Sequence, residues 1–227
     1  MQSRGKESLP NAQRAGGWRF PVAGLMAAVL LLAEPAAVQA QLTYTVADGY
    51  ATITGFNGTN STVVIPSVTN GYPVIAIAPG AFQSLTTMTS IVISNGLATI
   101  GSSAFRLSGL TSVALPNSVT NIGSAAFYQC YTLGSVTLGT NVTILGDQAF
   151  EYCLDLTNVV LPNSLTSIGM YEFSACGDLG NISLPSSITS IGAYAFDGAG
   201  LTNITLGTNI TNIANYAFED SPLTSNA

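Results

Sequence analysis

Three cysteines are the residues whose type and spacing first suggest chemistry. Cys130, Cys153 and Cys176 are 23 residues apart, and each lies three residues after a phenylalanine. Such residues can form a disulfide, bind a metal or act as a nucleophile. Metal binding would need further ligands and thiolate catalysis would need a base. The chain has no histidine and no Cys-x-x-Cys pair to supply them. We expect three buried free thiols, and one disulfide between neighbouring cysteines is the alternative.

Four acidic residues form a second candidate group. Asp147, Glu151 and Asp155 lie within one 23-residue stretch, and Asp178 follows Asp155 by 23 residues. Paired carboxylates can hydrolyse a glycosidic bond or bind Ca²⁺. A general acid needs a sheltered carboxyl with a raised pKa, and the sequence implies no apolar pocket around these residues. We expect a solvated acidic edge on outer loops, with a weak Ca²⁺ site as the less favoured alternative. We predict no catalytic residue, no metal and no cofactor.

These residues belong to an internal repeat. Phenylalanines recur at steps of 22 or 23 residues, and LTSVALPNSVTNIGSAAF (110–127) has a close relative in LTNVVLPNSLTSIGMYEF (156–173). The aligned repeats form five apolar columns, and all length variation falls between the phenylalanine and the next repeat. A repeat solenoid requires constant spacing within the core and allows length variation only outside it, because core positions must superpose while a surface loop can vary in length. The buried aromatic column is predicted to contain Phe105, Phe127, Phe150, Phe173 and Phe196.

The local pattern predicts turns built mostly of β-structure. In Val113-Ala114-Leu115, apolar residues alternate with an outward-facing one, as in a strand. Proline or glycine follows and ends the strand. The segments before each phenylalanine are predicted to be short 3₁₀ or helical turns. A glycine column is interpreted as tight turns that need a positive φ; its members are Gly101, Gly123, Gly146, Gly169 and Gly192.

The pattern LxxVxLPxxVxxIGxxAFxxC closely resembles the BspA-like class of bacterial leucine-rich repeats, over about residues 74–223. The resemblance implies a leucine-rich-repeat fold and a secreted or surface-exposed protein, with a role in adhesion. We divide the chain into 1–40, a signal peptide; 41–80, a divergent N-terminal cap or first turn; and 81–227, the solenoid. The solenoid lacks a capping unit at its C-terminal end, so we expect either a tolerated open turn or a truncated sequence.

Residues 1–40 have the pattern of a secretory signal. Four basic residues precede an apolar run over 22–33, and small residues follow up to Ala40, the expected cleavage point. The run is too short for a membrane-spanning helix, which needs about 20 residues. The pattern therefore predicts export to the cell surface or the medium, with no transmembrane segment after cleavage.

The composition restricts the partners. Only 7% of the residues are charged, the net charge is −6 and the pI is about 4.2. Cleavage after Ala40 would remove every basic residue except Arg106 and leave nine acidic residues, for a formal charge of −8. Nucleic acid is excluded as a partner, because phosphate binding needs basic residues.

The expected concave strand face carries short neutral side chains, which suit a broad protein or glycan ligand better than a small molecule. A stripe of tyrosines is the other predicted contact patch. The sequence therefore predicts a secreted or cell-surface binding module that is not an enzyme, and a structural spacer or envelope component is the alternative. The predicted binding residues are Ser112, Ser135, Asn158, Asn181, Asn203, Thr137, Thr205, Tyr171, Tyr194 and Tyr216.

Overall fold

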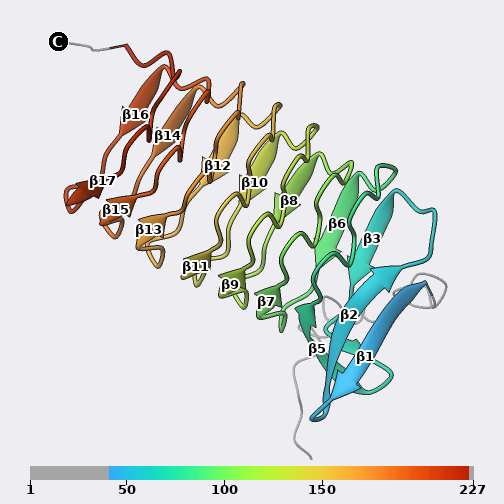
Figure 1. The fold of residues 1–227 in the computed structure, drawn as a ribbon. Helices are drawn as coiled ribbons and strands as arrows, with labels where there is room; N and C mark the ends of the chain where they lie inside the picture. The colour runs from blue at the N-terminus through green and yellow to red at the C-terminus, as the bar shows by residue number, and fades with distance from the viewer. Residues whose placement is uncertain (1–40, 225–227) are drawn as a thin grey trace, which may run out of the picture. The chain divides into compact units, whose positions relative to one another are not determined.

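Alternating apolar residues place a strand in each repeat, and a second, shorter strand follows it. The repeats stack as turns of a β-solenoid (Figure 1). The computed structural model describes residues 41–224. The predicted signal peptide, 1–40, lies outside the described residues. Residues 41–224 contain no helix with the length and hydrophobicity that a membrane span requires.

The longer strands of successive turns form one row along the solenoid, labelled β3 to β16 in Figure 1. Where hydrogen-bonded they are parallel and in register, so that Val113 pairs with Val136 and Val136 with Val159. The row forms three hydrogen-bonded groups, β3–β6, β8–β10–β12 and β14–β16. The strands are β3 (Thr62–Ile65), β6 (Ser90–Ile93), β8 (Ser112–Ala114), β10 (Ser135–Thr137), β12 (Asn158–Val160), β14 (Asn181–Ser183) and β16 (Asn203–Thr205).

Shorter strands form a second row. They pair in parallel from β5 to β11, and again from β13 to β17, with an interruption between β11 and β13. The row begins with β5 (Tyr72–Ile77) and continues through β7 (Thr99–Ile100), β9 (Asn121–Ile122), β11 (Ile144–Leu145), β13 (Ser167–Ile168), β15 (Ser190–Ile191) and β17 (Asn212–Ile213).

The N-terminal part of the described chain departs from the repeat. Strands β1 (Leu42–Ala47) and β2 (Tyr50–Phe56) form an antiparallel pair, and β2 then joins β5 in parallel. The small strand β4 (Val68–Thr69) pairs antiparallel with β5. The hairpin therefore covers the first edge of the short-strand row, which would otherwise expose unpaired backbone groups.

The core is the stack of apolar columns predicted from the repeat. The predicted phenylalanine column is fully buried and extends from Phe82 to the partly buried Phe218. Neighbouring rings stack with centroids 5.1–5.6 Å apart. In the last turn, Leu206 and Ile213 remain largely exposed, because no further described turn covers them.

The expected 3₁₀ or helical turns are not found among residues 41–224, where the corresponding segments are hydrogen-bonded turns. Around Phe127, for example, Ala125 has a φ of 56° and Gln129 a φ of 58°, and the same pair of positions is left-handed in every turn from Phe82 to Phe218. A left-handed residue on each side of the phenylalanine interrupts the run of right-handed residues that any helical turn needs.

The prediction that the glycine column needs positive φ is wrong, because none of its members lies in the left-handed region. The column is needed for close packing of backbones instead. A Cβ on Gly123 would lie 2.5 Å from the backbone nitrogen of Ser102 in the preceding turn, and one on Gly146 would lie 2.4 Å from that of Ser124. Only glycine allows the turns to approach this closely.

Candidate functional site

The long-strand row presents a regular face of small polar side chains. Each central strand buries its middle residue and exposes the two residues beside it. The parallel register places equivalent residues of neighbouring paired strands side by side, as for Ser135 and Asn158. We call this surface the long-strand face; it contains the exposed predicted residues Ser112, Ser135, Asn158, Asn181, Asn203, Thr137 and Thr205.

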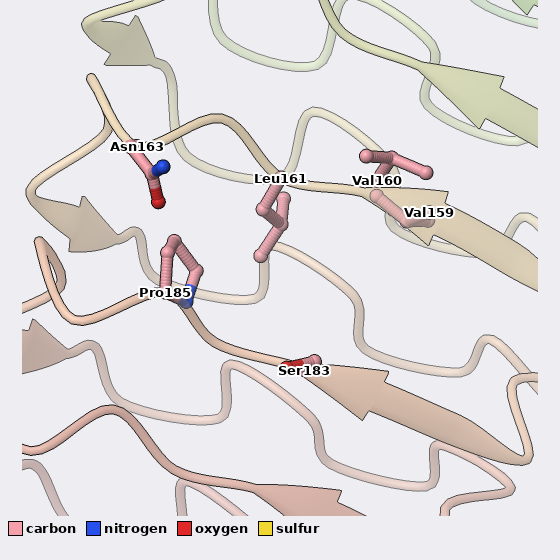
Figure 2. Close-up of a pocket in the computed structure, with 6 residues that line it drawn as sticks. All are labelled: Val159, Val160, Leu161, Asn163, Ser183 and Pro185. Carbon is pink, nitrogen blue, oxygen red and sulfur yellow. The ribbon is translucent and has the colours of Figure 1, made fainter.

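A shallow hollow interrupts this face between β12 and β14. It has a volume of about 380 Å³ and lies where these two strands are not hydrogen-bonded to each other. Figure 2 shows Leu161 and Asn163 pointing toward the turn that carries Pro185. Its lining combines apolar groups with an amide and a hydroxyl and contains no charge: Val159, Val160, Leu161, Asn163, Ser183 and Pro185. Sequence reasoning missed the hollow, because the repeat pattern does not show where pairing fails.

The tyrosine stripe is a separate surface. Tyr171 and Tyr194 stack with centroids 4.9 Å apart, and Tyr194 stacks on Tyr216 at 5.0 Å. These tyrosines follow the short strands, whereas the polar columns lie on the long strands, and Figure 1 shows the two strand types as separate rows. The structure therefore assigns the predicted binding residues to two surfaces.

The three cysteines are free and buried. Each thiol donates a hydrogen bond to the phenylalanine carbonyl of the preceding turn, as Cys130 does to Phe105 at 3.0 Å. Ser221 occupies the same column and its hydroxyl makes the same bond, to Phe196. Burial raises the pKa of the Cys130 thiol to about 11 and opposes thiolate formation. The column therefore supplies buried hydrogen-bond donors.

The predicted acidic edge is only partly correct. Asp147, Asp155 and Asp178 are exposed, but Glu151 is buried and so does not belong to a solvated edge. Burial raises the pKa of Glu151; a hydrogen bond from the Gln148 side chain lowers it, and the nearby Asp197 carboxylate raises it. Within residues 41–224, no group of three or more Asp, Glu, His or Cys side chains gathers as a metal site.

Glu172 is the residue that sequence reasoning missed. It occupies the position before the phenylalanine, where the other turns have Ala81, Ala104, Ala126, Ala149, Ala195 and Ala217. Its side chain is 0% exposed, and neither carboxyl oxygen has a hydrogen-bond partner. Burial raises its pKa well above the usual range and the Asp147 carboxylate raises it further, whereas the backbone N–H groups of Ala149 and Gly169, which face the carboxyl group outside hydrogen-bond geometry, lower it. The sequence signal that could have identified this residue is a glutamate at a position that is alanine in the other turns.

Parallel strands, 22–23-residue turns and buried leucine columns define a leucine-rich-repeat β-solenoid. The family model described as "BspA type Leucine rich repeat region" matches residues 56–177 and 143–226, with six copies. The chain therefore belongs to the BspA-type leucine-rich-repeat family. A search of curated proteins found no match.

Solved structures of bacterial leucine-rich-repeat proteins share the fold. A leucine-rich-repeat protein of T. pallidum is 26% identical, with a TM-score of 0.73 over 77% of this chain and 84% of that one. Proteins from Bacteroides ovatus and Eubacterium ventriosum are each 27% identical with a TM-score of 0.50, over 76% and 70% of this chain. The matches span 59% and 50% of those two proteins, respectively.

Proposed function

We propose that the protein is a secreted or cell-surface binding module that contacts a protein or glycan through its long-strand face. The observation that carries this proposal is the ordered array of exposed Ser, Asn and Thr side chains, held in register by buried neighbours. Such a preformed surface loses little conformational entropy on binding. Membership of the BspA-type family supports the proposal, because the resemblance implies surface exposure and adhesion.

The chemistry of the face favours a neutral ligand. The hollow between β12 and β14 offers apolar contact from Val160 and Pro185 and hydrogen bonding from Asn163 and Ser183. Arg106 is the only basic residue in 41–224. Residues 41–224 carry nine acidic side chains and one basic side chain, and this net negative charge would repel polyanionic glycans and acidic proteins. Binding, without catalysis, is the proposed role.

The proposal is tested with an array of matrix proteins and of neutral and acidic glycans. The decisive variant is Val160→Lys, because Val160 is 54% exposed on the long-strand face. Ile144→Lys is the matched control, since Ile144 is also β-branched and 54% exposed but lies on short strand β11. We expect the first substitution to abolish binding and the second to preserve it. Equal losses, or a folded wild-type chain that binds nothing on the array, would contradict the proposal.

Export is tested separately, because residues 1–40 lie outside the described residues. Expression in a bacterial host followed by mass spectrometry of the exported chain should detect a mature N-terminus at Gln41. Retention of the full-length chain in the cytoplasm would contradict export without bearing on the binding face.

A structural spacer is the alternative, and the uninterrupted stack of rings from Phe82 to Phe218 is compatible with it. Deleting residues 133–155 removes one repeat and joins equivalent positions, since Leu133 and Leu156 occupy the same column. A spacer predicts that this deletion alters the cellular phenotype while Tyr194→Ala combined with Asn181→Ala does not. A binding module predicts that surface substitutions on the long-strand face alter it.

A further inference from the structure

We propose that Asp147 and Glu172 form a site for a divalent cation of the Ca²⁺ type, in the gap between the turn of β11 and the turn of β13. The site goes beyond the proposed binding function and departs from the sequence-based expectation of no metal. Glu172 is decisive, because it places a carboxyl group in a column that is otherwise alanine.

The gap is visible in the backbone hydrogen bonds. In four turns the glycine after the short strand donates its N–H to an isoleucine carbonyl of the preceding turn at 2.8–2.9 Å; these are Gly101, Gly123, Gly146 and Gly192. Gly169 makes no such bond to Leu145, and Thr166 makes none to Thr143. Among residues 41–224, the short-strand row therefore opens only at this junction, where the carbonyls of Leu145 and Thr143 lack their usual donors.

Two carboxyl groups converge on the opened junction. A Cβ built on Gly169 would lie 2.6 Å from Oδ1 of Asp147 and 2.9 Å from Oε2 of Glu172. A Cβ built on any other glycine of this column would instead lie against backbone atoms of the preceding turn. The side-chain oxygens thus fill the space between turns, and the glycine leaves room for them.

The donor set suits a hard cation. Glu172 is completely buried with both oxygens unpartnered, which is costly unless an opposite charge or hydrogen bonds compensate. Asp147 is exposed, and its Oδ1 accepts a hydrogen bond from the Met170 N–H at 2.8 Å, so it connects the site with solvent. Ca²⁺ takes six to eight oxygen ligands in flexible geometry, which carboxylates, main-chain carbonyls and water supply together. The absence of histidine and of a nearby exposed thiol argues against a softer metal.

The test uses the full chain, stripped with EDTA, and two probes. Tyr171, next to Glu172 in sequence, provides a sensitiser for Tb³⁺ luminescence, which Ca²⁺ should displace. Thermal unfolding is then followed while CaCl₂ is raised to about 10 mM, above the Kd range of roughly 10⁻⁴–10⁻³ M typical of extracellular Ca²⁺ modules. We expect Tm to rise by about 3–5 °C at ten times Kd.

Three variants determine whether the effect comes from this site. Glu172→Ala restores the residue of the column and should fold, and Asp147→Asn keeps an oxygen that can accept from Met170. Both should lose the Tb³⁺ signal and the Ca²⁺-dependent rise in Tm, whereas Asp178→Asn, at an exposed acid elsewhere, should keep both. The proposal is overturned if the wild-type chain shows no Ca²⁺ effect, or if Glu172→Ala responds as the wild type does.

Discussion

The ring of Phe127 lies parallel to the ring of Phe150 in the next turn, with centroids 5.2 Å apart and planes 5° apart. Phe150 makes the same kind of contact with Phe173 on its other side, at 5.6 Å. A central ring therefore joins two neighbouring turns, and its loss should weaken both junctions.

Replacing Phe150 with alanine should destabilise the solenoid by about 3–5 kcal/mol, because it removes a fully buried ring and leaves a cavity between two others. Chemical denaturation followed by circular dichroism measures the change. Tyr131→Ala is the control: Tyr131 is largely exposed, so its loss should change stability by no more than about 0.5 kcal/mol. Similar values for the two variants would show that the column is not the energetic centre of the fold.

Adding one methyl group at Gly146 should destabilise the protein by about 1–3 kcal/mol, because the new Cβ would meet backbone of the preceding turn at 2.4 Å. Gly134→Ala provides the comparison, since the nearest atoms there lie at 3.6 Å and φ is not positive. We expect Gly134→Ala to change stability by less than about 0.5 kcal/mol. The free energies of unfolding of the two variants decide between close packing and turn geometry as the reason for the glycine column.

Substituting Glu172 by alanine in a metal-free buffer with EDTA should stabilise the protein at pH 8 by about 1–3 kcal/mol, because a buried unpartnered group is removed. Burial, aided by the Asp147 carboxylate, raises the pKa of Glu172 in the folded state above its unfolded value. The stability linked to this proton is therefore present at low pH and is lost as the pH rises through the folded-state pKa.

The measurement is the free energy of unfolding of both chains between pH 4 and pH 8. The wild-type chain should lose stability relative to Glu172→Ala as the pH rises, and the two should be nearly equal at pH 4. A difference that does not depend on pH would mean that the pKa of Glu172 is the same in the folded and unfolded states.

The cysteine thiols should resist alkylation in the folded protein. Burial raises the pKa of Cys130, Cys153 and Cys176, so thiolate is scarce and reagent cannot reach the sulfur atoms. Iodoacetamide followed by mass spectrometry should detect no labelled cysteine in native buffer and three in denaturant. If two cysteines stayed unlabelled in denaturant until a reductant was added, the protein would contain the alternative, a disulfide.

Much of the architecture was predictable from the sequence, because every turn has to satisfy the same packing constraint. Leu110, Leu133 and Leu156 stand at equivalent positions and are all completely buried. The strand at Val113-Ala114-Leu115 follows from alternation alone, and β8 covers its first two residues. The free, buried cysteines were predicted in the same way, from a column that also accepts small residues.

The sequence pattern alone could not show why the glycines were needed, since the relevant distance, from Gly123 to Ser102, exists only once the turns are stacked.

The period of the chain and the apolar columns thus determined the solenoid and its core, because a repeated pattern of burial has one stacked solution. Only the tertiary structure decided where that stacking fails. The hollow beside Val160 and the meeting of Asp147 with Glu172 both arise where strands of adjacent turns do not pair. Pairing depends on the distance between backbones of neighbouring turns, which no single repeat specifies.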